Sequence, residues 1–392
     1  MYKLEKVATG VCAAEGFFAD GISAGLKPNG AKDMAFIYSD TLCDIASVFT
    51  TNKMTAAPIR HFRAKGNFQT NFVLINSKNA NAMTGKAGIE DIDEILATLS
   101  KEVHNPVMSS TGVIGVRLPK QTLIEGAKQF KLEHKNPHVA AQAIMTTDSF
   151  SKEIAYKVTL EDGKSFHIGA MAKGAGMINP AMATMLCFIT TDADVSKEEM
   201  QKLLSHNTHL TFNAASVDGD TSTNDTVMFL SNKKSGVYNK EALNEALYEI
   251  MTFLAREMVR DGEGATKLVT YKITGAKDDN EAEIVAKALS NSLLVKTALY
   301  GEDPNWGRIA STVGASGVEA DEATLSISFD DVCVYEKGRL HFDEAMEAKA
   351  AKVMKKESFT ISCDLGIAQG SFQAYGCDLG YKYVEINADY RT

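Results

Sequence analysis

The sequence of 392 residues predicts an α+β fold, in which strands and helices mix along the chain. A continuous apolar run at 72–76 is bounded by polar residues and is typical of a buried strand, and residues 185–193 are a second candidate for such a strand. Residues 156–174 alternate apolar and polar side chains about Asp162-Gly163, which predicts a β-hairpin. We therefore expect helices layered on sheets rather than a doubly wound parallel sheet.

The N-terminal half alternates predicted strands with predicted helices. Ile89, Ile92, Leu96 and Val103 recur at helical spacing, so we expect a helix over these residues. In chain order the expected elements are a strand at 47–52, a strand at 72–76, a helix at 89–103, a strand that begins at 107, and helices at 123–130 and 139–147.

The C-terminal half contains two helices with clear start signals. Ser196 and Glu199 form a capping box, which satisfies the first free N–H groups of a helix. Asn239 begins a longer run of helical spacing, which ends at Gly262. Strands dominate the remainder, with one helix among them: strands at 324–329, 332–336, 358–366 and 381–386, and a helix at 343–356.

Composition and charge exclude several classes of function. The chain has 50 acidic and 41 basic residues and a net charge of -9, so it lacks the basic surface that nucleic acid requires. No apolar run approaches the roughly 18 residues of a membrane span, so we expect no membrane partner. The cysteines form no C-x-x-C pair, the N-terminus lacks the apolar core of a signal peptide, and the histidine spacing fits no metal site. These features predict a cytoplasmic protein without a bound metal.

The segment 173–189 carries the most distinctive pattern for chemistry. Glycines follow Lys173, and Ala183-Thr184 stand directly before an apolar strand. Cleavage between these two residues would leave Thr184 at the start of a new chain, where its α-amine could take the proton from its hydroxyl. An amine pKa of about 8 suits that role near neutral pH. A threonine at a strand start is more often only a strand former, so the segment alone does not decide between a structural and a nucleophilic role for Thr184.

Three further segments could form the site around such a nucleophile. Thr111-Gly112, in a loop after a strand, could offer a hydroxyl and a backbone N–H to one oxyanion. Glu263 lies between two glycines after a long helix and could contact a substrate amine. The acid-rich segment 217–225 lacks the spacing of a calcium loop, which predicts a hydrogen-bonded turn near the site. For Thr111-Gly112 the alternative is an ordinary turn at the end of a strand, and for Glu263 it is a solvated turn at the end of a helix.

At these residues the chain resembles the glutamate N-acetyltransferase/ornithine acetyltransferase family of arginine biosynthesis. The resemblance covers essentially the whole chain, and it depends on the common order of motifs that are each weak alone. The motifs are NANAMTG (79–85), SSTGVIG (109–115), AIMTTD (143–148), KGAGMINPAMATML (173–186), SVDGDTSTND (216–225), RDGEGATK (260–267), GEDPNWGRI (301–309) and EINADYRT (385–392).

The resemblance implies a precursor that cuts itself between Ala183 and Thr184, with Thr184 as the acyl-accepting nucleophile. It implies that Thr111 and Gly112 form the oxyanion pair. Substrate contacts are implied at further positions, with Thr146 as the alternative to Thr147: Thr147, Lys173, Thr184, Glu263, Asn387 and Thr392.

Charge suggests roles for two of these residues, because Lys173 could pair with a carboxylate and Glu263 with the side-chain amine of ornithine. One departure from the family pattern is Ala181, which stands where a polar residue, often Asn, is common. The lost hydrogen bond could slow cleavage or alter the pocket.

The implied reaction moves acetyl from N2-acetyl-L-ornithine to L-glutamate through an ester on Thr184, without a cofactor. Acetyl-CoA as a second acetyl donor, which would make the enzyme bifunctional, stays open. The implied fold is a layered α/β/β/α sandwich of the type shared with self-processing aminopeptidases. The products, an α chain (1–183) and a β chain (184–392), would intertwine rather than form independent domains, and would pair again into a heterotetramer of two α and two β chains.

Two other functions are alternatives to acetyl transfer. A self-processing aminopeptidase or amidase on a related fold would use water as acyl acceptor, so ornithine would be released without formation of acetylglutamate. A non-enzymatic binding protein would remain a single uncut chain.

Overall fold

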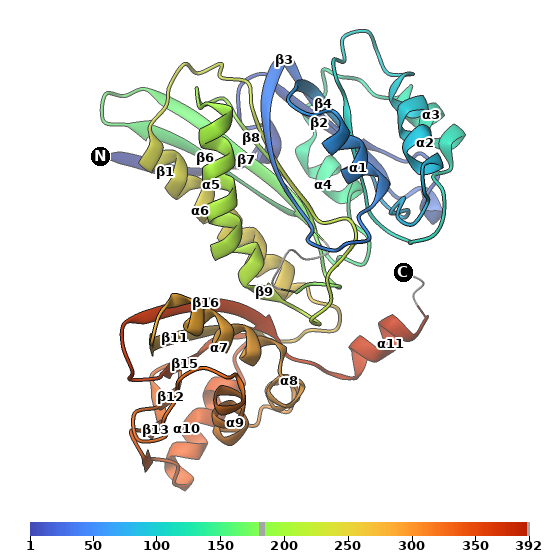
Figure 1. The fold of residues 1–392 in the computed structure, drawn as a ribbon. Coiled ribbons are helices and arrows are strands. Elements are labelled where there is room, and N and C mark those ends of the chain that lie inside the picture. The colour runs from blue at the N-terminus through green and yellow to red at the C-terminus, as the bar shows by residue number, and fades with distance from the viewer. Residues whose placement is uncertain (180–184, 390–392) are drawn as a thin grey trace.

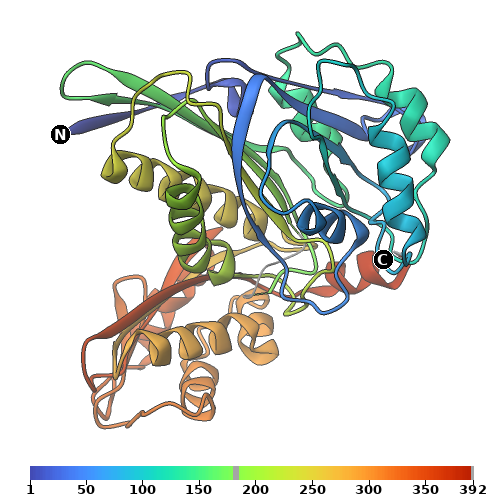
Figure 2. The same cartoon turned by 45° about the horizontal axis from the view of Figure 1, so that its top comes forward.

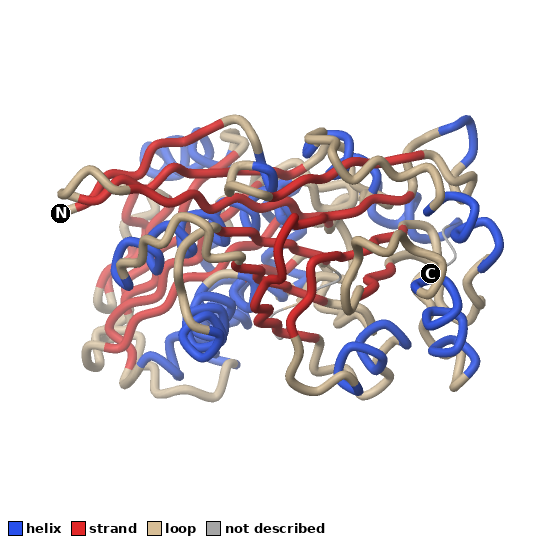
Figure 3. Tube along the Cα trace, turned by 90° about the horizontal axis from the view of Figure 1, so that it is seen from above, coloured by secondary structure: helices blue, strands red, loops and turns tan. Residues whose placement is uncertain are grey.

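The computed structural model describes residues 1–179 and 185–389, which form two bodies (Figure 1). The larger body contains most of the chain up to residue 260, and the smaller body contains most of the remainder. Strands run through the middle of the molecule and helices lie around the outside, as the view from above shows (Figure 3). This mixture confirms the predicted α+β class.

The described residues of the larger body form a nine-stranded mixed sheet in the order β1-β6-β7-β8-β10-β3-β4-β5, with β2 beside β3. The hairpin expected about Asp162-Gly163 is β6–β7, and Gly163 takes the positive φ of 82° that its turn requires. The strands are β1 (Tyr2–Val7), β2 (Phe17–Ile22), β3 (Met34–Phe49), β4 (Gln69–Asn76), β5 (Val107–Ser110), β6 (Lys152–Leu160), β7 (Ser165–Lys173), β8 (Leu186–Thr191) and β10 (Thr226–Ser231).

Two helices of the larger body, α5 and α6, begin at the caps that the sequence predicts. Ser196 Oγ accepts a hydrogen bond from Glu199 N at 3.3 Å, and Asn239 Oδ1 accepts one from Ala242 N at 2.9 Å. The helices are α1 (Ala57–Ala64), α2 (Ala87–Leu96), α3 (Lys120–Ala127), α4 (Pro137–Ala143), α5 (Lys197–Leu210) and α6 (Lys240–Arg260), with short 3-10 turns η1 (Gly10–Cys12), η2 (Pro28–Gly30) and η3 (Phe212–Ala214).

The large sheet folds back on itself to give four layers. In β4, Val73 lies in the central core, whereas Leu74 lies in an outer core beneath α2 and α3. In β8, Phe188 lies in the same central core, whereas Ile189 lies in the outer core beneath α5 and α6. Two halves of the sheet therefore face each other between two helical layers, which confirms the predicted α/β/β/α sandwich. Both faces of these strands are covered, which explains their continuous apolar sequences.

Strand β3 joins the two halves of the sheet. Its first part pairs with β2 and β4, and its last part pairs with β10. The register with β4 shifts between Tyr38 and Cys43, which is a bulge of the kind that bends a strand.

The described residues of the smaller body form a seven-stranded sheet with helices packed on its apolar face. Its strands, in the order β14-β13-β12-β15-β11-β16-β9, are β9 (Ala215–Ser216), β11 (Leu268–Ala276), β12 (Ser326–Phe329), β13 (Val332–Glu336), β14 (Arg339–Leu340), β15 (Ser358–Asp364) and β16 (Gly370–Cys377). Its helices are α7 (Asp279–Asn291), α8 (Leu293–Tyr300), α9 (Trp306–Ala315) and α10 (Glu344–Met354).

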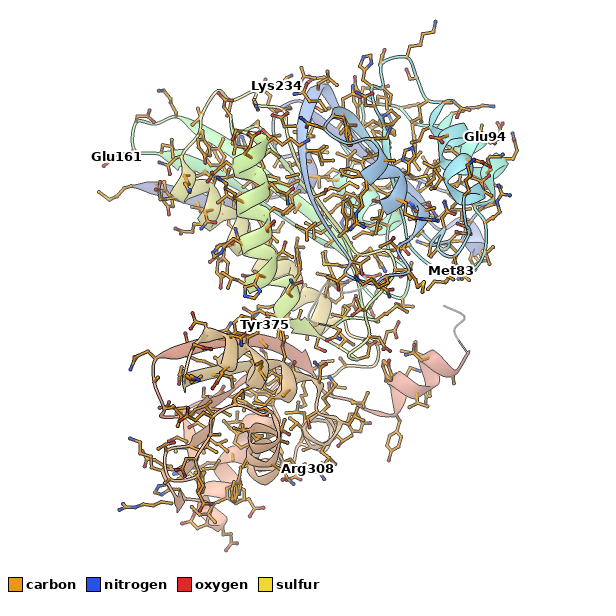
Figure 4. The ribbon with its side chains drawn as sticks, viewed as in Figure 1. Met83, Glu94, Glu161, Lys234, Arg308 and Tyr375 are labelled. Atoms are coloured by element: carbon orange, nitrogen blue, oxygen red, sulfur yellow. The ribbon has the colours of Figure 1, made fainter. Side chains whose placement is uncertain are left out.

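The two bodies share part of one core. Tyr375 of β16 lies at their boundary (Figure 4) and belongs to the apolar cluster that includes α6. Its ring lies 5.6 Å from the guanidinium carbon of Arg256 on α6. The smaller sheet is therefore packed against the sandwich rather than tethered to it.

The last helix corrects one expectation. Residues 381–386 were expected to form a strand, but Tyr381–Asp389 form helix α11, which lies beside the larger body (Figure 2). A short run that alternates apolar and polar residues fits either structure, because periodicity over six residues does not separate the two. Over the described residues, no helix is both long enough and apolar enough to cross a bilayer.

Candidate active site

One cavity of about 170 Å³ collects side chains from both halves of the chain. It is smaller than the roughly 300–1,000 Å³ of pockets for drug-sized ligands, which suits a small metabolite. Its lining comes from the loops after β4, β5, α4 and β7, the turn before β10, the end of α6, and α11. The lining residues are Ala80, Thr111, Gly112, Ile114, Thr146, Thr147, Lys173, Gly176, Met177, Asp218, Asp220, Ser222, Thr223, Asn224, Glu263, Tyr383 and Asn387.

Thr111 and Gly112 form one wall of the cavity, directly after β5. Gly112 has a φ of 133°, and a Cβ there would lie 2.1 Å from the carbonyl carbon of Lys78, so only glycine fits. Among the described residues, none accepts a hydrogen bond from the N–H of Gly112. Thr111 Oγ1 accepts one from Lys173 Nζ at 3.4 Å, which leaves its own proton for a group in the cavity. The pair can supply two donors, as an oxyanion requires.

Lys173 ends β7 and is buried, with its Nζ 3.9 Å from Asp148 Oδ2. Burial lowers the pKa of Lys173, and Lys152 lowers it further, while the carboxylates of Asp148, Glu263 and Asp225 raise it. Burial alone would raise the pKa of Asp148, but the charges of Lys173 and Lys152 bring it down to about 2. The protonation of Lys173 therefore depends on the carboxylates around it.

Glu263 presents a carboxylate of fixed orientation. Its backbone N–H donates to Ala175 O at 2.8 Å, and its Oε2 accepts from Asn387 Nδ2 at 2.8 Å. A Cβ on Gly176 would lie 2.5 Å from Glu263 Cδ, so the missing side chain makes room for the carboxyl group. The Glu263 carboxylate is therefore already oriented to interact with a cation that binds in the cavity.

Helix α11 brings Tyr383 and Asn387 to the same cavity, because residues four apart lie on one face of a helix. Tyr383 Oη donates to Asp218 Oδ2 at 3.2 Å. The Asp218 carboxylate also accepts from the backbone N–H groups of Met177 at 2.6 Å and Ile178 at 2.9 Å. Burial raises its pKa, and these N–H donors oppose that effect. The segment 217–225 is thus a hydrogen-bonded turn at the site, as predicted.

Asp225, at the end of this turn, is fully buried. Its Oδ1 accepts from Met185 N at 3.2 Å, while Oδ2 has no hydrogen-bond partner among the described residues. Burial raises the pKa of Asp225 well above its usual range. Met185 is the residue that follows the predicted nucleophile in the sequence, so the Asp225 carboxyl group contacts the chain at the position directly after Thr184.

The family is decided by sequence comparison. A sequence model of the ArgJ family matches residues 18–392. The arginine biosynthesis bifunctional protein ArgJ of Wolinella succinogenes is 61% identical to this chain, and the match covers 100% of both chains. The chain belongs to the ArgJ family. Like-named proteins of Synechocystis and Caldanaerobacter subterraneus subsp. tengcongensis are 41% and 42% identical, over 97% and 96% of this chain and 98% and 97% of their own.

Membership of the ArgJ family confirms the resemblance predicted from the motifs, and it makes this chain an acyltransferase of arginine biosynthesis. Two solved structures are also similar. ArgJ from Bacillus halodurans shares 40% identity over 52% of this chain and 98% of that chain, with a TM-score of 0.49. Ornithine acetyltransferase from Mycobacterium tuberculosis, complexed with ornithine, shares 33% identity over 45% of this chain and 97% of that chain, with a TM-score of 0.38.

The described site residues predicted for this ArgJ-family chain line the cavity together: Thr111, Gly112, Thr147, Lys173, Glu263 and Asn387. Thr146 lines it as well, so the structure does not separate Thr146 from Thr147. Ala181, Ala183, Thr184 and Thr392 lie outside the described residues. Across residues 1–179 and 185–389, no three His, Cys, Asp or Glu side chains gather as metal ligands would.

Asn224 and Tyr383 line the cavity, but the sequence analysis did not single them out. Asn224 Nδ2 donates to Ala80 O at 2.7 Å and to Ser110 O at 2.8 Å, so it ties together two loops of the cavity wall. Asn224 lies in the acid-rich segment 217–225, and this position could have indicated that it belongs to the site. Tyr383 was hidden because its segment was expected to be a strand.

Proposed function

We propose that this chain transfers acetyl from N2-acetyl-L-ornithine to L-glutamate through an ester on Thr184. L-Ornithine and N-acetyl-L-glutamate are the products. The observation that carries the proposal is the common cavity: residues 111, 112, 147, 173, 263 and 387, chosen from motifs far apart in the sequence, line one space of metabolite size. A chance similarity of motifs gives no reason for these positions to meet.

In the first half-reaction, Thr184 Oγ attacks the acetyl carbonyl carbon of acetylornithine. Its proton passes to the α-amine of Thr184, and the carbonyl oxygen becomes an oxyanion. Thr111 Oγ1 and the N–H of Gly112 supply donors to that oxyanion. The C–N bond then breaks, the departing nitrogen takes the proton, and ornithine leaves behind an acetyl ester.

The second half-reaction reverses these steps with glutamate as acceptor. Its α-amine attacks the ester carbon, the C–O bond breaks, and Thr184 Oγ regains its proton. Because the same cavity holds two amino acids in turn, ping-pong kinetics follow. Lys173 attracts a substrate carboxylate, and Glu263, oriented by Asn387, attracts the side-chain ammonium of ornithine.

We place the self-cleavage between Ala183 and Thr184, so that the chains 1–183 and 184–392 share one sheet. Strands β7 and β8 stand on either side of this position in sequence, and they are hydrogen-bonded neighbours over residues 168–173 and 186–191. The two chains would thus stay together after cleavage, and we propose that two pairs form a heterotetramer.

We assign the enzyme to the cytoplasm, with small amino acids as substrates and no resident cofactor. The six cysteines are unpaired, which supports a reducing compartment.

Intact mass spectrometry tests the proposal directly. The wild-type protein should yield two chains that begin at residues 1 and 184, and incubation with acetylornithine should add one acetyl group to the second. Thr184→Ala should leave one uncut, inactive chain, and Thr184→Ser should cleave partially. A cleaved and active Thr184→Ala protein would refute the mechanism.

Two assays separate the remaining versions of the activity. Acetylglutamate formation with acetyl-CoA as the sole donor would show the bifunctional enzyme, and its absence the monofunctional one. Release of ornithine without acetylglutamate would instead indicate an amidase that uses water as acceptor.

A further inference from the structure

Four charged side chains form a buried quartet beside the cavity: Asp148, Lys152, Lys173 and Asp261. Lys152 Nζ lies 2.8 Å from Asp148 Oδ1 and 2.5 Å from Asp261 Oδ2, and Lys173 Nζ lies 3.9 Å from Asp148 Oδ2. Each of the four side chains is at most 2% exposed. The charges alternate in sign along the quartet, and only Lys173 lines the cavity.

Stability does not account for this quartet. Removing charges from water costs several kcal/mol for each ion, and well-packed apolar residues in the place of a buried ion pair are often neutral or stabilising. The buried quartet therefore indicates that its charges have a role other than stabilising the fold. Its position beside the cavity indicates that this role is in the candidate active site.

Asp148 is the member that acts on the cavity wall. Its Oδ2 accepts from Thr146 N at 2.9 Å, and its Oδ1 accepts from Gly174 N at 2.6 Å. One carboxylate thus holds the backbone on both sides of the cavity wall, at the Thr146-Thr147 loop and directly after Lys173. Among the described residues, the same group is the nearest counter-charge to Lys173.

We propose that Asp148 is a positioning residue that keeps Lys173 charged and aimed at a substrate carboxylate, with Lys152 and Asp261 balancing its own charge. The proposal rests on the proposed function, because it gives Lys173 the carboxylate of an amino-acid substrate as its ligand. Asp148 itself is not among the residues that line the cavity, and it acts through Lys173 and the backbone.

The direction of each effect follows from the groups that face Lys173. Asp148, Glu263 and Asp225 favour its ammonium form, whereas burial, Lys152 and the ammonium of Lys27 favour the neutral amine. Asp148→Asn should therefore let Lys173 lose its proton at lower pH, by about one to three pH units for a counter-charge within roughly 4–6 Å. Lys152→Gln removes a repelling charge and should shift the titration of Lys173 to higher pH.

The experiment follows the titration of Lys173 by NMR in the full-length protein labelled with [ε-13C]lysine, with Lys173→Arg to assign the resonance. Asp162→Asn is the matched control, because this carboxylate is 53% exposed in the β6–β7 turn. It should leave the titration and the activity unchanged. In parallel, the alkaline limb of kcat/KM for acetylornithine should move to lower pH in Asp148→Asn and to higher pH in Lys152→Gln.

Opposite shifts in the two variants support the proposal, since a general loss of packing would move both titrations the same way. An unchanged titration in Asp148→Asn, shifts of the same sign, or failure of both variants to fold would overturn it in favour of a purely structural quartet. If only one variant folds, the sign of its shift decides. Opposite shifts in a protein that transfers no acetyl group would refute the proposed function and leave the role of Asp148 intact.

Discussion

Gly112→Ala should abolish most of the activity, for two reasons that the structure quantifies separately. The φ of 133° is unfavourable for alanine, and strain of this kind costs about 1–3 kcal/mol. The added Cβ would also lie 2.1 Å from the carbonyl carbon of Lys78, so the Thr111-Gly112 loop must move. Displacing one oxyanion donor typically costs about 3–4 kcal/mol of barrier, which is roughly a 100- to 1,000-fold loss in kcat.

The neighbouring Gly115 provides a matched control for Gly112→Ala. Its φ is also positive, at 84°, but no atom lies within 4 Å of an added Cβ. Gly115→Ala should therefore lower the melting temperature through strain alone and keep most of the activity. The assay is single-turnover acetylation by acetylornithine, with circular dichroism to follow unfolding. A Gly112→Ala protein with the same rate of acetylation as Gly115→Ala would refute the assignment of the oxyanion wall.

Three further substitutions test other parts of the site. Thr111→Ala should slow turnover by about 10- to 1,000-fold with little change in stability, and an unchanged rate measured by steady-state kinetics would remove Thr111 from the site. Glu263→Gln should raise KM for acetylornithine by roughly 10- to 100-fold, the size of a lost charge-assisted hydrogen bond, and an equal rise for glutamate would contradict a role in binding the ornithine ammonium. Asp225→Asn should raise the melting temperature at neutral pH. Burial raises the folded pKa of Asp225, so its stabilising contribution is complete below its unfolded pKa of about 4 and is lost as the pH rises through the folded value. The gain from asparagine should shrink as the pH falls, and a gain that is constant with pH would count against this explanation.

The layered core could be predicted because its strands are covered on both faces. Residues 72–75 are then all apolar, and such a continuous run is visible in the order of residues alone. The helix caps at Ser196 and Asn239 were equally visible, since each depends on a local side-chain hydrogen bond. Helix α11 was not predictable, because its placement depends on contacts between Asn387 and Glu263, residues 124 apart in sequence.

Some residues of the candidate site could likewise be predicted from the sequence, and others could not. Thr111, Lys173 and Glu263 could be selected because they lie in motifs whose common order along the chain resembles that of a known family. The quartet around Asp148 could not, because it joins the start of β6 to the end of α6 and depends on a pairing that no local spacing encodes. Asn224 is similar, since its amide links two loops that precede it by more than 100 residues.

The order of strands in the large sheet has a consequence for genetics. Strands β8 and β10 lie between β7 on one side and β3 on the other, so segments from before residue 179 enclose segments from after residue 185. If the gene were divided at codon 184 and its parts expressed separately, each fragment would leave open sheet edges that the other fragment normally fills. Such fragments should be insoluble when produced alone and should complement each other only when synthesised in the same cell.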